Sequence, residues 1–186
     1  MKAMDFEAMD ACALMNRVDT KYVFSKSRLL GVLESVASDY RVLNVAGSAL
    51  SPYENLYFDT PDHQCYLQHH NGRLNRYKCR IRRYVSSDLC FLEVKTRNNK
   101  GRTAKQRMAI DDMEYTLSAA SKEYLKEITG SLPDFVPQLW SRFSRITLVS
   151  QEHEERATLD VDLAFSHNGC RHEIPGIAIA EVKQSR

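Results

Sequence analysis

The feature that most constrains this chain is an alternation of charged and apolar residues with a period of two, repeated along many short segments. Successive side chains of a β-strand point to opposite faces of a sheet, so each such segment has one charged and one apolar face. Residues 74–85 show the pattern most clearly, with four basic positions on one face: Arg76, Lys78, Arg80 and Arg82. The sequence therefore predicts a sheet with one strongly charged face.

The same alternation predicts most of the secondary structure. Eight further segments are expected as strands: 17–24, 40–46, 53–59, 90–97, 102–110, 139–149, 156–165 and 177–184. Three helices are expected at 5–16, 26–38 and 117–129, with Ser25 or Ser27 capping the second and Gly130 ending the third. Many strands joined by short turns, with few crossover helices, indicate an α+β fold built on an antiparallel β-barrel.

The formal net charge is only +2, but the basic residues are clustered in one part of the sequence. Between Gly72 and Arg107 the chain holds eleven other Lys and Arg residues, and its only acids there are Asp88 and Glu93. Like charges side by side on a strand repel each other, which costs stability unless an anion neutralises them. We therefore favour a barrel with a charged lumen and an apolar outside covered by helices over an open sheet with a solvated basic face.

A lumen lined with Arg and Lys suits a small, highly charged anion such as phosphate, which Arg can hold in bidentate fashion. Carboxylates beside phosphate make sense where a divalent cation lies between them, because Mg²⁺ and Mn²⁺ take carboxylate and phosphate oxygens. Glu181, Glu93 and either Asp160 or Asp162 are candidates, and an ion pair is the alternative for each. We favour an ion pair for Glu93, which shares its face with Lys95, and a metal role for Glu181.

The remaining composition places the chain in a reducing, cytoplasmic setting. Five cysteines, with no pair spaced as CxxC, do not suit a disulfide framework or a zinc cluster. The first fourteen residues carry three acids and do not read as a signal peptide. No apolar run approaches the roughly 18 residues that span a membrane.

Several short motifs follow one another in a specific order and spacing. They are Arg17-Val18-Asp19-Thr20-Lys21-Tyr22, Asn55-Leu56-Tyr57-Phe58-Asp59-Thr60, the run from Arg76 to Tyr84, Leu92-Glu93-Val94-Lys95, Lys105-Gln106-Arg107, Phe143-Ser144-Arg145, the run from Arg156 to Asp162, and Glu181-Val182-Lys183. In these motifs the chain resembles the VTC-type polyphosphate polymerase domain, a member of the triphosphate tunnel metalloenzymes. The resemblance covers nearly the whole chain.

The resemblance implies one tunnel domain over residues 1–186 that transfers the γ-phosphoryl group of ATP to a growing polyphosphate chain, with Mn²⁺ or Mg²⁺. By matching position it implies catalytic phosphate contacts from Lys21, Arg80, Arg82, Arg145 and Arg156, and a metal ligand in Glu181. Lys95 also matches a phosphate contact of the family. The charged faces add five phosphate-binding candidates: Arg76, Lys78, Lys105, Arg107 and Lys183. ATP and inorganic polyphosphate are the expected partners.

Two features separate the chain from its expected relatives. Hydrolytic tunnel enzymes begin with Glu-x-Glu-x-Lys, and here Arg17 stands first, which disfavours a triphosphatase or a class IV cyclase. The polymerase family usually continues beyond the Glu-x-Lys strand, so we expect this chain to bind polyphosphate better than it makes it. A polyphosphate-binding module and a triphosphate hydrolase remain alternatives. A nucleic-acid-binding barrel is the weakest, because Tyr77 and Tyr84 fall on opposite faces.

Overall fold

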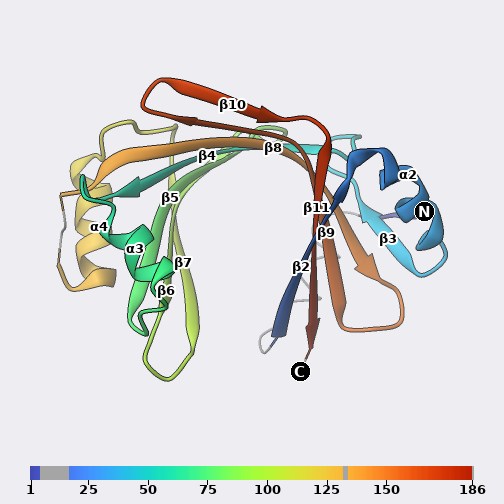
Figure 1. Ribbon diagram of the computed structural model, residues 1–186, viewed down its shortest axis with the longest axis horizontal. Coiled ribbons are helices and arrows are strands. Elements are labelled where there is room, and N and C mark those ends of the chain that lie inside the picture. Colours follow the sequence, from blue (N-terminus) through green and yellow to red (C-terminus); the bar gives the residue numbers. More distant parts are fainter. Residues whose placement is uncertain (5–16, 132–133, 186) are drawn as a thin grey trace. The chain divides into compact units, whose positions relative to one another are not determined.

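The computed structural model describes residues 1–4, 17–131 and 134–185 (Figure 1). Within them the strands are β1 (Ala3–Met4), β2 (Arg17–Ser25), β3 (Tyr40–Leu43), β4 (Ser51–Asp59), β5 (Arg76–Tyr84), β6 (Leu89–Arg97), β7 (Thr103–Ile110), β8 (Val136–Ser150), β9 (Glu155–His167), β10 (Cys170–Ile174) and β11 (Ile177–Ser185). The helices are η1 (Lys26–Arg28), α2 (Leu29–Ser35), α3 (Gln64–His70) and α4 (Ala119–Thr129). The helix expected at 5–16 lies outside the described residues.

The strands form one sheet in the order β2-β11-β9-β8-β4-β5-β6-β7, with β3 beside β8, β10 beside β9, and β1 beside β3. The pairs β2–β11, β11–β9, β3–β8, β5–β6 and β6–β7 are antiparallel, whereas the short pair β1–β3 is parallel. The predicted class, α+β on an antiparallel sheet, is confirmed. Among the described residues the sheet is not closed into a barrel, because β2 and β7 stand at opposite ends of the strand order. All nine expected strands are present, with bounds that differ by up to three residues.

The chain divides into two compact units. We call Met1–Tyr53, Arg142–Ala164 and His172–Arg186 the terminal unit, and Glu54–Ser141 with Phe165–Arg171 the central unit. The strands β4, β8, β9 and β10 each contribute residues to both.

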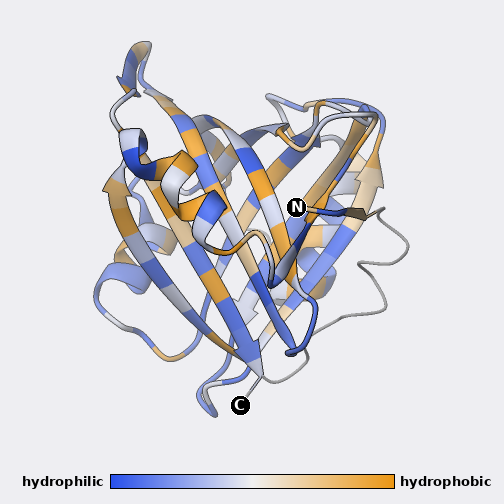
Figure 2. Ribbon diagram, turned by 90° about the vertical axis from the view of Figure 1, so that its right-hand side faces the viewer, coloured by the Kyte–Doolittle hydropathy of each residue, from blue (hydrophilic) through white to orange (hydrophobic). Residues whose placement is uncertain are grey.

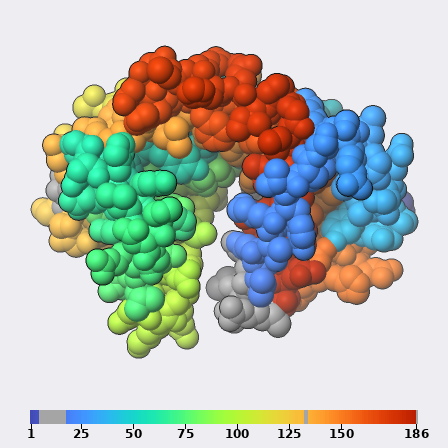
Figure 3. Space-filling view, viewed as in Figure 1, coloured from blue at the N-terminus to red at the C-terminus, as the bar shows by residue number. Residues whose placement is uncertain are grey.

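The core of the central unit lies on the apolar face of β5 and β6. Cys79 stands opposite Val94, and Ile81 opposite Leu92, and all four side chains are fully buried. They pack with Leu125 of α4, so the predicted helical cover over the apolar face is confirmed in this unit. In the space-filling view, α3 and β5–β7 (green to yellow-green) form one continuous mass (Figure 3).

The terminal unit repeats this design with different elements. β11 lies between β2 and β9, and Figure 2 shows the alternation as hydrophilic and hydrophobic stripes along the strands. The apolar side chains of Leu148, Ala157 and Leu159 form a core cluster. Leu29 and Leu33 of α2 pack against this cluster, so a helix covers the apolar face here as well.

The helices correct the sequence-based prediction at two points. The helix expected at 26–38 is a 3-10 turn followed by α2, and neither serine caps it, because the Ser25 hydroxyl contacts the Ser27 hydroxyl at 2.8 Å instead. The helix α3 was not expected. It begins where the Asp59 carboxylate accepts the backbone N–H groups of Cys65 and Tyr66, at 2.8 and 2.9 Å. This cap comes from the last residue of β4 and not from His63, which directly precedes the helix and makes no side-chain capping bond.

The end of α4 follows the prediction. Ser118 caps its start by accepting the N–H of Ser121 at 3.2 Å, and Gly130 ends it with φ of 74°, a left-handed conformation that suits glycine.

Candidate functional site

The basic face of the central unit lies on the side of β5–β7 opposite the apolar core. The strand register places Lys78, Lys95 and Lys105 directly opposite one another across the three strands, and it places Arg76 opposite Arg97. The predicted phosphate-binding residues of this unit therefore share one face: Arg76, Lys78, Arg80, Arg82, Lys95, Lys105 and Arg107. Like charges directly opposite each other are destabilising unless something neutralises them.

One buried carboxylate neutralises part of this face. Glu93, whose side chain is 3% exposed, accepts bonds from Arg80 Nε and Nη2 on one oxygen, at 2.8 and 2.6 Å. Its other oxygen contacts Lys105 Nζ at 2.5 Å. Burial by itself raises the pKa of Glu93, but attraction from Arg80, Arg82 and Lys105 outweighs burial and brings the pKa down to about 2. The expected ion pair of Glu93 is confirmed, with Arg80 and Lys105 as partners rather than Lys95.

The charge of Lys78 on this face carries an electrostatic cost. Loss of hydration lowers the pKa of Lys78, and the charges of Lys95, Arg76 and Arg80 lower it further. An anion bound beside these groups would remove that cost. The face therefore has the electrostatic properties of an anion-binding surface.

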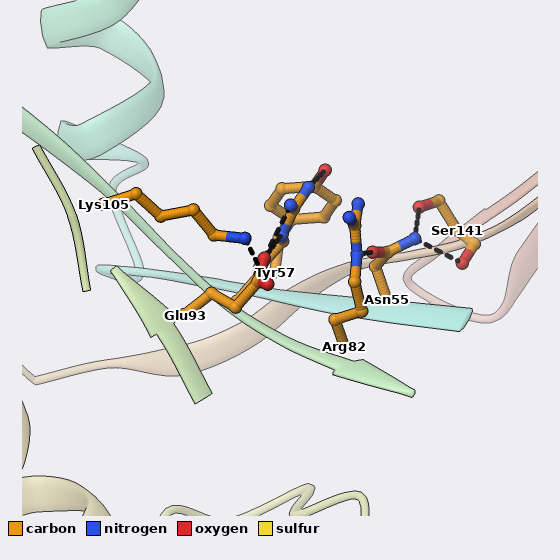
Figure 4. Close-up of polar contacts among 7 residues, drawn as sticks. Asn55, Tyr57, Arg82, Glu93, Lys105 and Ser141 are labelled. Atoms are coloured by element: carbon orange, nitrogen blue, oxygen red, sulfur yellow. Dashed lines mark hydrogen bonds and ion pairs between the residues drawn. The ribbon is translucent and has the colours of Figure 1, made fainter. Parts of the chain in front are cut away.

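Two residues that the sequence analysis assigned no role also contact the arginines of β5 (Figure 4). The Asn55 side-chain oxygen accepts a hydrogen bond from Arg82 Nε at 2.8 Å, and the Tyr57 hydroxyl accepts one from Arg80 Nη1 at 3.0 Å. Both belong to β4 and both sit at odd positions of an alternating strand, so the same period-two pattern could have identified them.

The basic face of the terminal unit centres on Glu181 of β11. One carboxylate oxygen of Glu181 pairs with Lys21 at 2.7 Å and the other pairs with Lys183 at 2.9 Å. Burial raises the pKa of Glu181, but the hydrogen bonds and charges of the two lysines dominate and bring it down to about 2. Arg156 of β9 stands opposite Lys183 in the register. Lys21 and Lys183 thus share one carboxylate, and Arg156 stands beside Lys183 on the neighbouring strand.

Arg145 lies in the same unit and is held on three sides. Its Nε and Nη2 bond the two oxygens of Asp160 at 2.6 and 2.7 Å. Its guanidinium also lies 5.4 Å from the Tyr53 ring centre and 5.1 Å from that of Phe143. Burial alone would lower the pKa of Arg145, but the bonds with Asp160 raise it overall. This arginine stays charged in a fixed position.

The two acids considered as alternative metal ligands are both in ion pairs. Asp160 binds Arg145, and Asp162 contacts Lys26 Nζ. These contacts favour the ion-pair interpretation for both. Glu181 likewise pairs with two lysines, and its metal role stays a prediction that rests on the family resemblance.

The donor atoms around Glu181 can be compared with what a hard divalent cation needs. Across from Glu181 in the register stands Thr158, whose buried hydroxyl has no hydrogen-bond partner among the described residues. A carboxylate and a hydroxyl are oxygen donors that suit Mg²⁺ or Mn²⁺. No group of three or more His, Cys, Asp or Glu suited to a metal occurs in the part of the chain that the structure describes. The residues therefore fit an ion that takes most of its ligands from phosphate and water.

Comparison with solved structures gives the class of this fold. A proposed adenylate cyclase of Bacillus halodurans is 14% identical, with a TM-score of 0.59, over 92% of this chain and 83% of the other. One from Vibrio parahaemolyticus is 14% identical, with a TM-score of 0.54, over 94% and 78%. A proposed adenylyl cyclase of Hippeastrum, described as having a dominant triphosphatase activity, is 13% identical, with a TM-score of 0.54, over 91% and 79%.

The chain thus shares the fold of these three proteins. The chain belongs to the VTC domain family, whose match covers residues 16–186. The predicted family is confirmed. No curated protein sequence matches the chain. The helices of the described residues include none that is both long and apolar enough to cross a membrane.

Proposed function

We propose that this chain is a cytoplasmic phosphotransferase that moves the γ-phosphoryl group of ATP onto a growing polyphosphate chain. Its substrates are then ATP and inorganic polyphosphate, and residues 1–186 act as one tunnel domain. Membership of the VTC domain family supports a triphosphate or polyphosphate substrate.

The observation that carries the proposal is the row of lysines across β5, β6 and β7. Lys78, Lys95 and Lys105 stand in register on one face, although like charges in these positions repel. A repeating polyanion relieves this repulsion at every strand, because each phosphate brings oxygens that accept charge-assisted hydrogen bonds. A row of cations fits a linear chain of phosphates better than it fits one small anion.

The residues proposed to act on the reacting phosphates fall into two sets. In the central unit Arg80 and Arg82 hold phosphate oxygens, with further contacts from Arg76, Lys78, Lys95, Lys105 and Arg107. In the terminal unit Lys21, Arg145 and Arg156 do so, with Lys183 beside them. Phosphoryl transfer has a loose transition state, so positioning and neutralisation of charge supply most of the catalysis. No side-chain nucleophile is needed.

Glu181 would hold the divalent cation, Mn²⁺ or Mg²⁺, with the hydroxyl of Thr158 beside it. When bound, such an ion neutralises charge on phosphate oxygens. Lys21 and Lys183, which both pair with Glu181, would offer their ammonium groups to phosphate oxygens of the substrate. Glu181 thus keeps two lysines in place until the substrate arrives.

The test is incubation of the purified protein with ATP and MnCl₂, followed by separation of polyphosphate from free phosphate. We expect chains of polyphosphate that lengthen with time and ADP in matching amount. A variant with Arg80→Ala and Arg82→Ala, purified in the same way, controls for contaminating kinases. Release of free phosphate alone would identify a hydrolase, and binding without turnover would identify a polyphosphate-binding module. Absence of both binding and turnover would refute the proposal.

A further inference from the structure

Two polar residues of β4 lie next to the arginines of β5 but belong to none of the roles assigned above. Asn55 and Tyr57 alternate with Leu56 and Phe58, which are 4% and 2% exposed and belong to the core. Since neighbours along a strand face opposite ways, Asn55 and Tyr57 project to the basic side. β4 and β5 are adjacent in the sheet, so the pair lies beside Arg80 and Arg82.

Asn55 is completely buried, which is unusual for an amide unless its hydrogen bonds are satisfied. Its oxygen accepts from Arg82 Nε at 2.8 Å, and its nitrogen donates to the Ser141 hydroxyl at 3.2 Å (Figure 4). The partners fix which way the amide points, because Arg82 can only donate. Hydrogen bonds therefore link Ser141 of β8, Asn55 of β4 and Arg82 of β5, and the last of them is made by Nε of the Arg82 guanidinium.

Tyr57 contacts Arg80 in two ways. Its hydroxyl accepts from Nη1 at 3.0 Å, and its ring centre lies 5.7 Å from the guanidinium carbon. The other side of Arg80 is bonded to Glu93 through Nε and Nη2. The guanidinium is thus held by the ring, the hydroxyl and the carboxylate together, which leaves its plane little freedom to turn.

We propose that Asn55 and Tyr57 are positioning residues that orient Arg82 and Arg80 for phosphate. The inference rests on the proposed function, because it concerns how that site holds a phosphate chain. An unsupported arginine loses much conformational freedom when it binds, whereas one that is already oriented loses less. The spacing of two residues on β4 matches the spacing of two on β5, so each arginine has its own support. Asn55 and Tyr57 act only through the arginines.

The experiment measures the affinity for inorganic tripolyphosphate by calorimetry. The variants are Tyr57→Phe, which keeps the ring and loses the hydroxyl, and Asn55→Leu, which keeps the size and loses the amide. Each is expected to weaken binding roughly tenfold, the typical effect of losing one hydrogen bond to a charged group. Tyr115→Phe, at an exposed tyrosine of the same unit, is the matched control and should leave the affinity unchanged.

A double-mutant cycle separates positioning from a general effect on the fold. In an Arg80→Ala background, Tyr57→Phe should have no further effect on the affinity, and in an Arg82→Ala background the same holds for Asn55→Leu. The slope of log affinity against log salt gives a second readout. The positioning variants should keep the wild-type slope, because no cation is lost, whereas each arginine variant should lower its magnitude by about one.

Asn55→Leu leaves the Ser141 hydroxyl without its partner in a buried place, so this variant can fail to fold. Tyr57→Phe and Ser141→Ala then carry the test, and Ser141→Ala should weaken binding less than Asn55→Leu because Arg82 keeps its acceptor. Wild-type affinity in folded Tyr57→Phe and Asn55→Leu, together with a loss in Arg80→Ala and Arg82→Ala, would overturn the positioning role and leave the proposed function standing. Failure of the wild-type protein to bind tripolyphosphate would overturn both.

Discussion

The buried carboxylate of Glu93 leads to a prediction about folding stability that a substitution and a change of pH test together. Glu93→Gln keeps the shape of the side chain and removes its charge. In the folded protein the pKa of Glu93 is about 2, against an ordinary value of 4.5. At about 1.4 kcal/mol for each pH unit, this difference corresponds to about 3 kcal/mol of folding stability. The side chain is 3% exposed, so solvent screens little of it.

The lowered pKa of Glu93 determines how the folding stability changes with pH. A carboxylate whose pKa is depressed by folding stabilises the protein fully above pH 4.5, and this contribution is lost as the pH falls towards 2. At pH 7 Glu93→Gln should therefore be less stable than wild type by about 3 kcal/mol. Near pH 2 the side chain is about half protonated in the folded protein and almost fully protonated in the unfolded chain, so most of the stability difference between the two proteins should be gone.

Urea denaturation of both proteins at pH 7, 4 and 2.5 measures this difference. Glu181 is expected to titrate in the same range, but it is present in both proteins and its contribution cancels in the comparison. Glu123→Gln, at an exposed position of α4, is the matched control and should change the stability at pH 7 only slightly. A stability difference for Glu93→Gln below about 0.5 kcal/mol at pH 7, or one that is the same at every pH, would refute the electrostatic argument.

Three further predictions follow from the contacts. Arg80→Ala with Arg82→Ala should abolish tripolyphosphate binding in calorimetry and also lower the melting temperature, because Glu93 loses a buried partner; unchanged affinity would exclude β5 as a binding strand. Glu181→Gln should remove manganese-dependent turnover while polyphosphate stays bound in a gel-shift assay, and persistent turnover would make it a structural partner of its lysines. Leu125→Ala in α4 should lower the free energy of unfolding by about 2–5 kcal/mol, measured by urea denaturation, because this side chain is 0% exposed in the core.

The sequence predicted the sheet well because the alternation is a local property. A segment such as β5 has basic residues at every second position, and this pattern fixes both its strand structure and the face that must be buried. Strands β6, β9 and β11 were found for the same reason. The basic faces could therefore be assigned residue by residue without knowledge of the strand order.

The features that were missed depend on contacts between different elements of the fold. The start of α3 depends on Asp59, a strand residue, and the partners of Glu93 depend on which strands pair with β6. Lys95, two residues from Glu93, was the natural partner by sequence, but Arg80 and Lys105 stand on the neighbouring strands. The contact of Asn55 with Arg82 likewise requires the pairing of β4 with β5.

Each basic face carries a carboxylate that bridges two cations, and this arrangement has a physical reason. A face of Lys and Arg must stay folded when no phosphate is bound, and Glu93 between Arg80 and Lys105 reduces the repulsion in the central unit. Glu181 does the same for two lysines in the terminal unit. A bound phosphate chain must compete with these carboxylates for the same donors. A divalent cation that binds Glu181 would release its lysines to the substrate, so affinity for polyphosphate should rise with metal in wild type more than in Glu181→Gln.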